Sequence, residues 1–369
     1  MKKESTQDNN GTSDNLVPSL PVFSGHIYVF AAFDIGEDIK FEDVKKSKDV
    51  QVGKVHVSKF LKNYHLPLEI ELPHPHDSGR CISSKIHPFG AISLIYKIPV
   101  TSSLQDLRQT VVDVDQKHQK QCINDAYSIY KKIKPFTVKP NFFQLKTYYT
   151  VVQVDTKKEF SGEQLTDQYG HIIASLLRLE TENLSDYQKE DIIKSSIGYF
   201  KKDLVIIDTE AAFVYDPQYE ELLDFFELGN IQQLELHYFD KLLDTQLTTL
   251  YEQKSPKLPI LSYMPFIGSR YFDPIGDLNR LKVDISVITE RLESSIKIVG
   301  EAYFSEVYDL IVTQFNLRSW QKSINKKLNI IKEIRYVYQN KVDANREDLL
   351  SVLIIILIMI EVFFAMTKH

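Results

Sequence analysis

Hydrophobic and polar positions change their spacing several times along the chain, and each spacing predicts a different element. Residues 25–35, GHIYVFAAFDI, are apolar and rich in aromatic and β-branched side chains, which is typical of a buried strand. Alternating runs at 50–60 and 67–73 predict half-buried strands. The apolar stretch 87–100 predicts a longer strand that Pro99 closes.

Helical spacings of three and four begin after Ser103, a residue type that caps helices. The stripe of this predicted helix runs through Leu104, Leu107, Val111, Val114, His118 and Cys122. Later patterns predict a strand at 141–154, helices at 163–179 and 186–200, and a strand pair at 203–217. We therefore expect residues 25–215 to form one mixed α+β domain of sheet and helices, preceded by a disordered tail at 1–24.

The chain changes character after Pro217. Residues 218–252 have a helical pattern that is apolar on a wide face, so partners must bury this helix on more than one side. After a connector, a heptad seam runs through Leu278, Leu281, Ile285, Ile288 and Leu292. A second helical stripe runs through Leu317, Trp320, Ile324, Leu328 and Ile331. Residues 216–346 are thus predicted to form a long helical hairpin or an oligomeric coiled-coil stalk.

The apolar run at 349–366 predicts a C-terminal transmembrane helix. Its eighteen residues would extend about 27 Å as a helix, close to the hydrocarbon thickness of about 30 Å. The membrane-contacting residues would include Leu349, Ile354 and Ile358. Two alternatives are a buried core helix and self-association of the run without lipid. Glu361, inside the run, either pairs with a membrane partner or another protomer, or is accommodated at the interface.

Flanking charge predicts the orientation of this span. Seven basic residues precede it, namely Lys322, Lys326, Lys327, Lys332, Arg335, Lys341 and Arg346, and only Lys368 follows it. By the positive-inside rule, the N-terminal body would stay in the cytoplasm or an organellar matrix. The basic segment would contact anionic lipid, contact RNA phosphates if a ribosome is the partner, or form an ordinary solvated helix face. Since the N-terminus lacks an apolar secretory signal, we expect a tail-anchored, single-pass membrane protein.

Composition and charge exclude several classes of protein. The formal net charge is −6 and the pI is about 6.0, so nucleic acid is an unlikely partner. Two cysteines, Cys81 and Cys122, supply no disulfide framework and no metal-ligand spacing, which suits a reducing compartment.

Motifs that carry chemistry are weak in this sequence. Phosphate-binding glycine loops, GxSxG and HExxH are absent. His74, His76 and Asp77 have a spacing that permits zinc, although exposed loop histidines are the simpler interpretation. Asp113 and Asp115 are assigned to the solvated side of their helix. Asp208 and Glu210 are assigned to an ordinary turn. We therefore predict no catalytic residue, no cofactor and no metal, and expect a protein that is not an enzyme.

The last ninety residues resemble a known family. The segments ISVITERLESS, NLRSWQKSINKKL and REDLLSVLIIILIMIEVFF are similar to the C-terminal part of the family named for being required for meiotic nuclear division. The matching span residues are Ile354, Ile355, Ile356, Leu357, Ile358, Ile360, Glu361 and Val362. The resemblance implies no known enzymatic activity and, for mitochondrial members, an inner-membrane assembly that supports organellar translation. The opening of the span lacks the family's tryptophan.

These patterns favour a tail-anchored membrane scaffold or tether. We expect it to be non-enzymatic and homo-oligomeric through its coiled-coil region, with the lipid bilayer and an unknown protein as partners. The alternative is a membrane-anchored enzyme or small-molecule sensor that uses a pocket in residues 25–215. A third hypothesis is an accessory subunit of a transporter, with Glu361 as its contact within the membrane.

Overall fold

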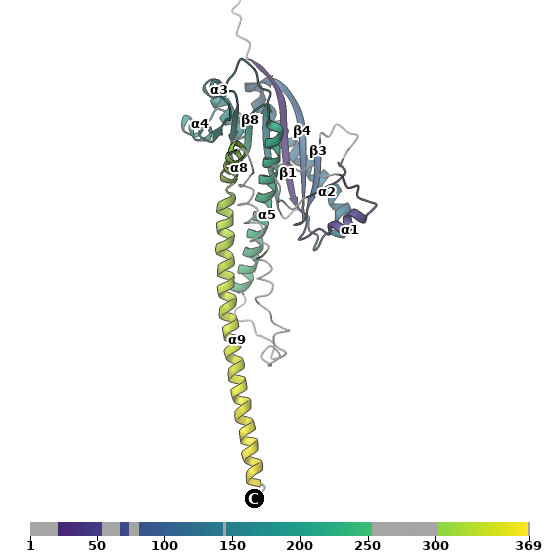
Figure 1. The fold of residues 1–369 in the computed structure, drawn as a ribbon, viewed down its shortest axis with the longest axis vertical. Coiled ribbons are helices and arrows are strands. Elements are labelled where there is room, and N and C mark those ends of the chain that lie inside the picture. The colour runs from purple at the N-terminus through teal and green to yellow at the C-terminus, as the bar shows by residue number, and fades with distance from the viewer. Residues whose placement is uncertain are drawn as a thin grey trace, which may run out of the picture.

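An eight-stranded sheet covered by helices on both faces forms the body of the protein, and one long helix leaves it as a single rod (Figure 1). The computed structural model describes residues 21–53, 67–73, 81–142, 145–252, 283 and 302–367. The first described residues lie at the end of the body opposite to the free end of the rod (Figure 1).

The elements follow one another along the chain in a mixed order. The strands are β1 Val22–Asp34, β2 Leu68–Glu69, β3 Cys81–His87, β4 Ala91–Ser103, β5 Lys146–Val154, β6 Ser196–Ile197, β7 Leu204–Ile207 and β8 Ala211–Tyr215. The helices are α1 Phe41–Lys46, α2 Leu104–Ile133, the 3-10 turn η1 Lys134–Phe136, α3 Gly162–Leu177, α4 Asp186–Ile193, α5 Tyr219–Glu252, α8 Ala302–Gln314 and α9 Leu317–Thr367. The prediction of an α+β fold is confirmed.

Strand order across the sheet is β2-β3-β4-β1-β5-β8-β7-β6. Every neighbouring pair is antiparallel except β5 and β8, which are parallel because α3, α4 and the β6–β7 hairpin intervene. The prediction that Pro99 closes its strand is wrong, because β4 continues to Ser103. Pairing with β3 ends at Tyr96, so Pro99 lies where β4 has a free edge, and its missing N–H is tolerated there.

The central strands are buried on both faces, which explains their nearly continuous apolar sequences. In β1, Ile27 and Val29 pack into the core under α2 and α3, whereas Tyr28 and Phe30 pack into the core under α5, α8 and α9. The result is a layer of helices on each side of one sheet. This arrangement buries most of the apolar residues on which the strand predictions rested.

Local signals fix the ends of the helices on the first face. The Oγ of Ser103 accepts a hydrogen bond from the Asp106 amide, so α2 begins where its cap predicts. Ser161 and Gln164 form a reciprocal capping box at the start of α3. Both caps satisfy amides that the first helical turn leaves without partners.

Two glycines allow a close approach at the end of the sheet where β1 finishes. Gly36 has φ of +150° and Gly90, in the β3–β4 turn, has φ of +87°. A Cβ atom on Gly90 would lie 2.1 Å from the carbonyl oxygen of Gly36. Only glycine fits this contact.

The second face is covered by the helices that follow residue 216. The wide apolar surface of α5 meets the sheet on one side and α8 and α9 on another, so partners bury this helix on more than one side, as its sequence predicts. Tyr308 of α8 donates its hydroxyl to Gln232 of α5 at 2.6 Å. Tyr303 donates to Asp216 at 2.6 Å. The helical region is therefore partly a layer of the same body.

Candidate functional site

The first third of α9 is built into the body. Its buried residues are Leu317, Ile324, Leu328 and Ile331, which join the core cluster that also contains α5. The partly buried Trp320 lies against His237 of α5, with ring centroids 4.3 Å apart. The predicted stripe thus lies on a helix that packs against α5, and the two helices run in the same direction (Figure 1).

Charged groups reinforce the contact between α5 and α9. The Nζ of Lys327 lies 2.7 Å from a carboxylate oxygen of Asp240 and 2.7 Å from one of Asp244. The hydroxyl of Ser323 donates to Asp240 at 3.3 Å. Although burial opposes the charged form, hydrogen bonds to the two carboxylates raise the pKa of Lys327 above its ordinary value. The charge is therefore held at this contact over the physiological range.

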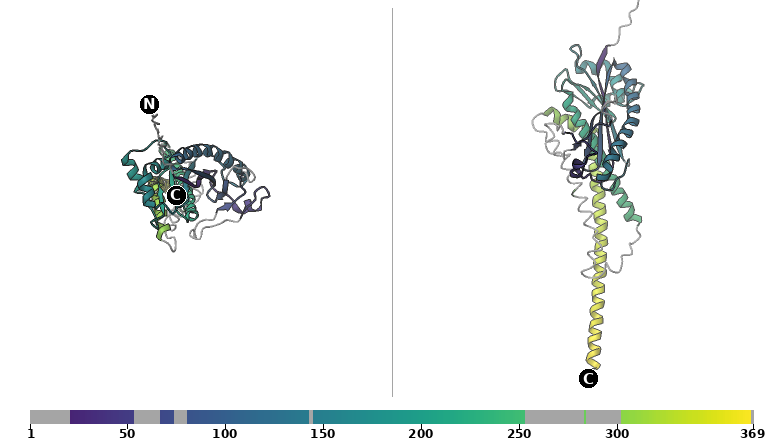
Figure 2. Two further views of the ribbon diagram at one scale, coloured as in Figure 1. Left: turned by 90° about the horizontal axis from the view of Figure 1, so that it is seen from above. Right: turned by 90° about the vertical axis from the view of Figure 1, so that its right-hand side faces the viewer.

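Beyond Ile331, α9 leaves the body. Among the described residues from 332 to 367, none is buried. The helix has 51 residues, about 76 Å at 1.5 Å per residue, and continues well past the end of α5 (Figure 2). A single unbroken helix therefore joins the core of the domain to the C-terminal apolar run.

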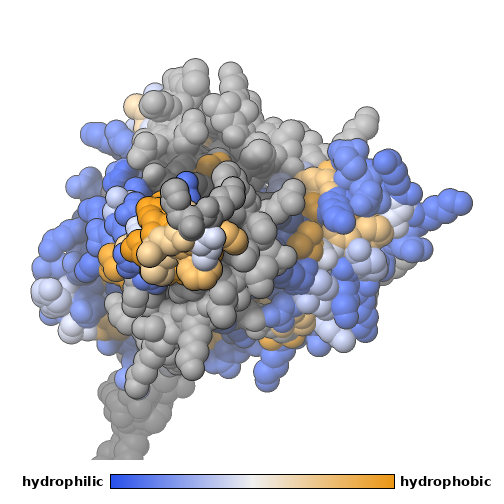
Figure 3. All heavy atoms as spheres, turned by 90° about the horizontal axis from the view of Figure 1, so that it is seen from below, coloured by the Kyte–Doolittle hydropathy of each residue, from blue (hydrophilic) through white to orange (hydrophobic). Residues whose placement is uncertain are grey.

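The projecting end of α9 is a candidate membrane span. Asp343–Thr367, 25 residues, is long and apolar enough to cross a bilayer, and none of it is buried. Leu349, Ile354, Ile358 and Glu361 are all exposed. Seen from below, apolar side chains gather at this end of the helix (Figure 3). The alternative of a helix buried in the protein's own core is wrong for this segment.

The predicted oligomer seam cannot be placed beside it. Leu278, Leu281, Ile285, Ile288 and Leu292 lie outside the described residues. The coiled-coil stalk therefore stays a prediction.

A buried charge cluster connects the sheet to α5. The Nζ of Lys85 on β3 lies 2.5 Å from one carboxylate oxygen of Glu227, and the hydroxyl of Ser93 on β4 donates to the other at 3.1 Å. His87 lies 3.0 Å from the Ser93 hydroxyl, and burial lowers the pKa of His87 to about 3. The imidazole is therefore neutral in the folded protein at neutral pH. The four side chains hold the polar part of the sheet against α5.

Asp34 supplies a pH-dependent contribution to stability. Its buried carboxylate accepts a hydrogen bond from the Gly36 amide at 3.2 Å, yet burial raises its pKa to about 6. In the unfolded chain, the Asp34 carboxyl ionises near pH 4. Because the folded protein keeps this proton up to about pH 6, the contribution of Asp34 to the free energy of unfolding falls as pH rises from about 4 to about 6 and is constant above that. Asp34→Asn keeps an acceptor and removes the charge. We expect it to add about 2 kcal/mol to the free energy of unfolding at pH 7 and nothing at pH 4.

Urea unfolding of both chains in mild detergent, at several pH values, measures this difference. An equal gain at pH 4 and pH 7 would show that the effect does not come from ionisation of Asp34.

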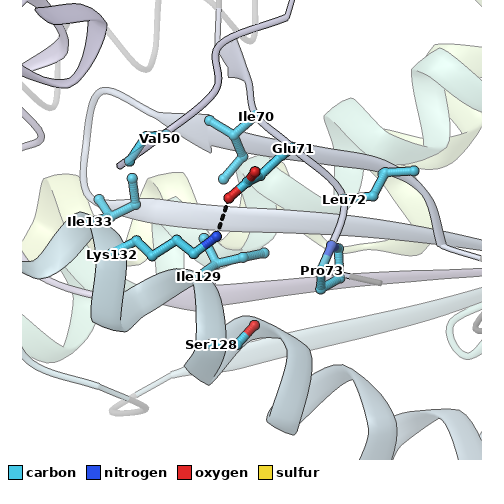
Figure 4. Close-up of a pocket in the computed structure, with 9 residues that line it drawn as sticks. All are labelled: Val50, Ile70, Glu71, Leu72, Pro73, Ser128, Ile129, Lys132 and Ile133. Carbon is cyan, nitrogen blue, oxygen red and sulfur yellow. Dashed lines mark hydrogen bonds and ion pairs between the residues drawn. The ribbon is translucent and has the colours of Figure 1, made fainter. Parts of the chain in front are cut away.

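A small cavity lies at the C-terminal end of α2 (Figure 4). Its volume is about 130 Å³, and its lining residues are Val50, Ile70, Glu71, Leu72, Pro73, Ser128, Ile129, Lys132 and Ile133. Lys132 and Glu71 form an ion pair across it. Sites for drug-sized ligands occupy about 300 to 1,000 Å³, so this cavity holds only water or a very small group.

Two acidic residues differ from their predicted surroundings. Asp115, assigned to a solvated face, is buried, and its carboxylate accepts hydrogen bonds from Thr150 at 3.1 Å and Gln119 at 2.7 Å. Asp208, assigned to an ordinary turn, is also buried and lies 2.6 Å from the guanidinium of Arg178. Both carboxylates connect helices to the sheet and neither faces a cavity described above.

The described part of the chain contains no group of three or more His, Cys, Asp or Glu side chains that could hold a metal ion. His74, His76 and Asp77 lie outside the described residues. Cys122, on the inward side of α2, is buried in the core, and burial raises the pKa of its thiol. It is therefore a poor nucleophile.

An exposed aromatic pair lies on the surface of the body. Tyr199 and Phe200, in the β6–β7 turn, are 62% and 66% exposed and contact each other edge to face. The carboxylate of Asp203 accepts a hydrogen bond from the Phe200 amide at 3.0 Å and fixes the turn. Rigid exposed aromatic side chains are common anchors in protein interfaces.

Comparison with known proteins places the sheet domain in a family. Residues 24–221 match the family model described as "Uncharacterized protein MJ0711, N-terminal domain". The chain belongs to this family. The match begins in β1, continues through the other seven strands of the sheet and ends in the first turn of α5. It does not include α8 or α9.

A relative in this family is the uncharacterized protein MJ0711 of Methanocaldococcus jannaschii. It is 25% identical over 199 residues, which cover 53% of this chain and 59% of the relative. The chain thus spans about three fifths of the relative's length. No solved structure matches the chain.

The predicted resemblance to the meiotic nuclear division family is wrong. The family match lies in the N-terminal half, not in the last ninety residues. Residues such as Ile354 and Ile358 belong to an apolar run that the bilayer favours in any protein, so their agreement with another family's span carries little information.

Proposed function

We propose that the protein is a membrane-anchored scaffold without enzymatic activity. In this proposal the end of α9 is a single transmembrane helix, and the α+β body lies in the cytoplasm or an organellar matrix. There it binds a protein partner as a homo-oligomer. The observation that carries the proposal is the unbroken α9, which is buried in the body at Ile324 and exposed and apolar from Leu349 onward.

The length of α9 would set the distance between the body and the bilayer. The segment 332–348, between the buried stripe and the apolar run, would hold the body about 25 Å from the bilayer if it stays helical. A helix resists bending more than a flexible linker does, so the body would keep a nearly constant orientation. The basic residues of this segment, such as Lys332 and Arg335, favour the cytoplasmic side.

The alternative is a membrane-anchored enzyme or small-molecule sensor. Within the described residues, the cavity between α2 and β2 is smaller than the sites such proteins use. The exposed pair Tyr199 and Phe200 is suited to a protein partner instead. We therefore favour the scaffold.

Truncation after Asp348 tests the anchor while keeping the buried part of α9. We expect the full chain to stay in the membrane pellet during alkaline carbonate extraction and the truncated chain to become soluble. The double variant Ile354→Lys with Ile358→Lys keeps the full length and should also leave the membrane, since each lysine costs about 2.5 to 3.5 kcal/mol in a span.

Protease added to sealed vesicles with the cytoplasmic face outward should digest the body. A full chain that carbonate extracts, or a truncated chain that stays in the pellet, contradicts the anchor. A protected body contradicts the orientation only.

A further inference from the structure

The chain has two cysteines, and the fold brings both to one buried tyrosine. Cys81 lies opposite Tyr96 in the β3–β4 ladder, so their side chains share one face of the sheet, with Cβ atoms about 5 Å apart. The Tyr96 hydroxyl donates to Asp125 of α2 at 2.6 Å, and Cys122 precedes Asp125 by one turn of the same helix. Tyr96 therefore connects the surroundings of one cysteine to those of the other.

Both thiols lie around this hydroxyl. The Tyr96 hydroxyl is a hydrogen-bond partner of the Cys81 thiol and of the Cys122 thiol. The Cys81 thiol also donates to the carbonyl of Ser83 at 3.3 Å. Tyr96 and Cys122 are fully buried, and Cys81 packs against the same core cluster at the edge of the sheet. The two sulfur atoms come from different layers of the body and meet only in the folded chain.

Neighbouring thiols either bind a soft metal ion or form a disulfide. A protein metal site needs further ligands, and the described residues include no group of three or more His, Cys, Asp or Glu side chains that could hold a metal ion. Oxidation of the pair is the chemistry that two thiols can perform without a third ligand.

We propose that oxidation joins Cys81 and Cys122 in a disulfide, which ties the edge of the sheet at β3 to α2. The sulfur–sulfur bond replaces the contacts that both thiols make with Tyr96. Lys85, on the same strand, is paired with Glu227 of α5. In the oxidised protein β3 is thus held on both sides, by a covalent bond to α2 and by an ion pair to α5. This device does not depend on the proposed membrane anchor.

Hydrogen peroxide is an oxidant that balances the reaction. The thiolate of Cys81, the partly exposed cysteine, attacks one oxygen, the O–O bond breaks, and hydroxide leaves. Cys81 is then a sulfenic acid. The sulfur of Cys122 attacks the sulfur of Cys81, the S–O bond breaks, and hydroxide leaves with the Cys122 proton as water. Two thiols are thereby oxidised to one disulfide, and one peroxide is reduced to two molecules of water.

Burial makes this reaction slow at neutral pH. It raises the pKa of Cys81 to about 12 and also raises the pKa of Cys122 above its ordinary value. Because the thiolate is the nucleophile, we expect the oxidation rate to rise about tenfold per pH unit between pH 7 and pH 9. A bond that forms slowly responds to sustained oxidising conditions and leaves the chain reduced in an ordinary reducing compartment.

Thiol counting on the full chain in mild detergent tests the pairing. The chain is treated with hydrogen peroxide while folded, then unfolded, and its free thiols are counted. We expect both thiols to be lost, the intact mass to fall by two hydrogen atoms, and dithiothreitol to restore both thiols. Cys81→Ser and Cys122→Ser each keep one thiol and are the matched controls. Chains that keep both thiols, gain oxygen instead, or join only to other chains overturn the pairing.

Urea unfolding of the oxidised and reduced chains, in the same detergent, tests whether the bond fits the fold. A disulfide that closes a loop of about 40 residues restricts the unfolded chain, so we expect the equilibrium constant for unfolding to fall about a hundredfold. Dithiothreitol should remove the difference. An oxidised chain that is no more stable than the reduced one would show that the bond forms only in a distorted structure, and the device would then be wrong.

Discussion

Replacement of Glu227 by alanine should destabilise the protein by about 3 kcal/mol. The substitution leaves the ammonium group of Lys85 buried without the carboxylate that lies 2.5 Å away, and removes the acceptor of the Ser93 hydroxyl. Burial opposes the charged form of Lys85, and the charge of Glu227 raises the Lys85 pKa above its ordinary value. An unpaired charge in this position costs more than the pair contributes.

A double variant separates these two effects. Lys85→Met with Glu227→Leu removes both charges and fills similar volumes, so most of the lost stability should return. Glu42→Ala is the matched control, because Glu42 and Lys45 form a similar pair at 2.9 Å on the exposed surface of α1. We expect no measurable change there. Urea unfolding in mild detergent measures all four chains. A Glu227→Ala chain as stable as Glu42→Ala would show that the cluster is solvated.

Residue spacing predicts β1, β4, β5, β7 and β8 and most of the long helices of the body, but it missed β3 and extended the helix of α4 over β6. In runs such as 25–35, the side chains that face each side of the sheet are both apolar, because helices cover both faces of the sheet. The cap at Ser103 likewise predicts the start of α2. The predicted end of β4 at Pro99 was wrong. A proline ends a strand only where its missing N–H is needed by a neighbouring strand, and residue spacing does not reveal which strands are neighbours.

Buried polar residues were harder to predict than buried apolar ones. The inward stripe of α2 continues from Val111 to Asp115, His118 and Cys122, so the spacing itself includes Asp115. Its charge led to assignment to the solvated face instead. Hydrogen bonds from Thr150 on β5 compensate its burial, and that strand lies 35 residues away in sequence. The position of Asp115 within the apolar stripe was therefore the signal in the sequence that this carboxylate is buried.

The charge cluster around Glu227 had a similar signal. Glu227 interrupts the apolar sequence between Phe226 and Leu228 in α5. Lys85 is a charged residue between Ser84 and Ile86 in β3. Neither pattern identifies the other as its partner, because 142 residues separate them. The pairing is a property of the three-dimensional arrangement. The candidate span, in contrast, depends on one continuous segment, so its sequence was sufficient to find it.

The same substitution of isoleucine by alanine should have different consequences at two positions of α9. Ile324 is 1% exposed and packs against the core, whereas Ile354 is 56% exposed in the candidate span. Ile324→Ala should lower the free energy of unfolding by about 2 to 5 kcal/mol, since it leaves a cavity at the contact with α5. Ile354→Ala creates no cavity in the body and should leave that free energy unchanged. Neither substitution should release the chain from the membrane, because the apolar run stays long enough to span it.

Trp320 makes this difference measurable at the contact itself. It is the one tryptophan of the chain, and its ring lies against His237 of α5. Its fluorescence therefore reports whether α9 is docked on the body, while circular dichroism reports the whole fold. If α9 is part of the cooperative core, Ile324→Ala shifts both signals together to lower urea concentration. A fluorescence change that precedes the loss of circular dichroism would show that α9 undocks from a body that stays folded, and the rigid connection between body and membrane would then be wrong.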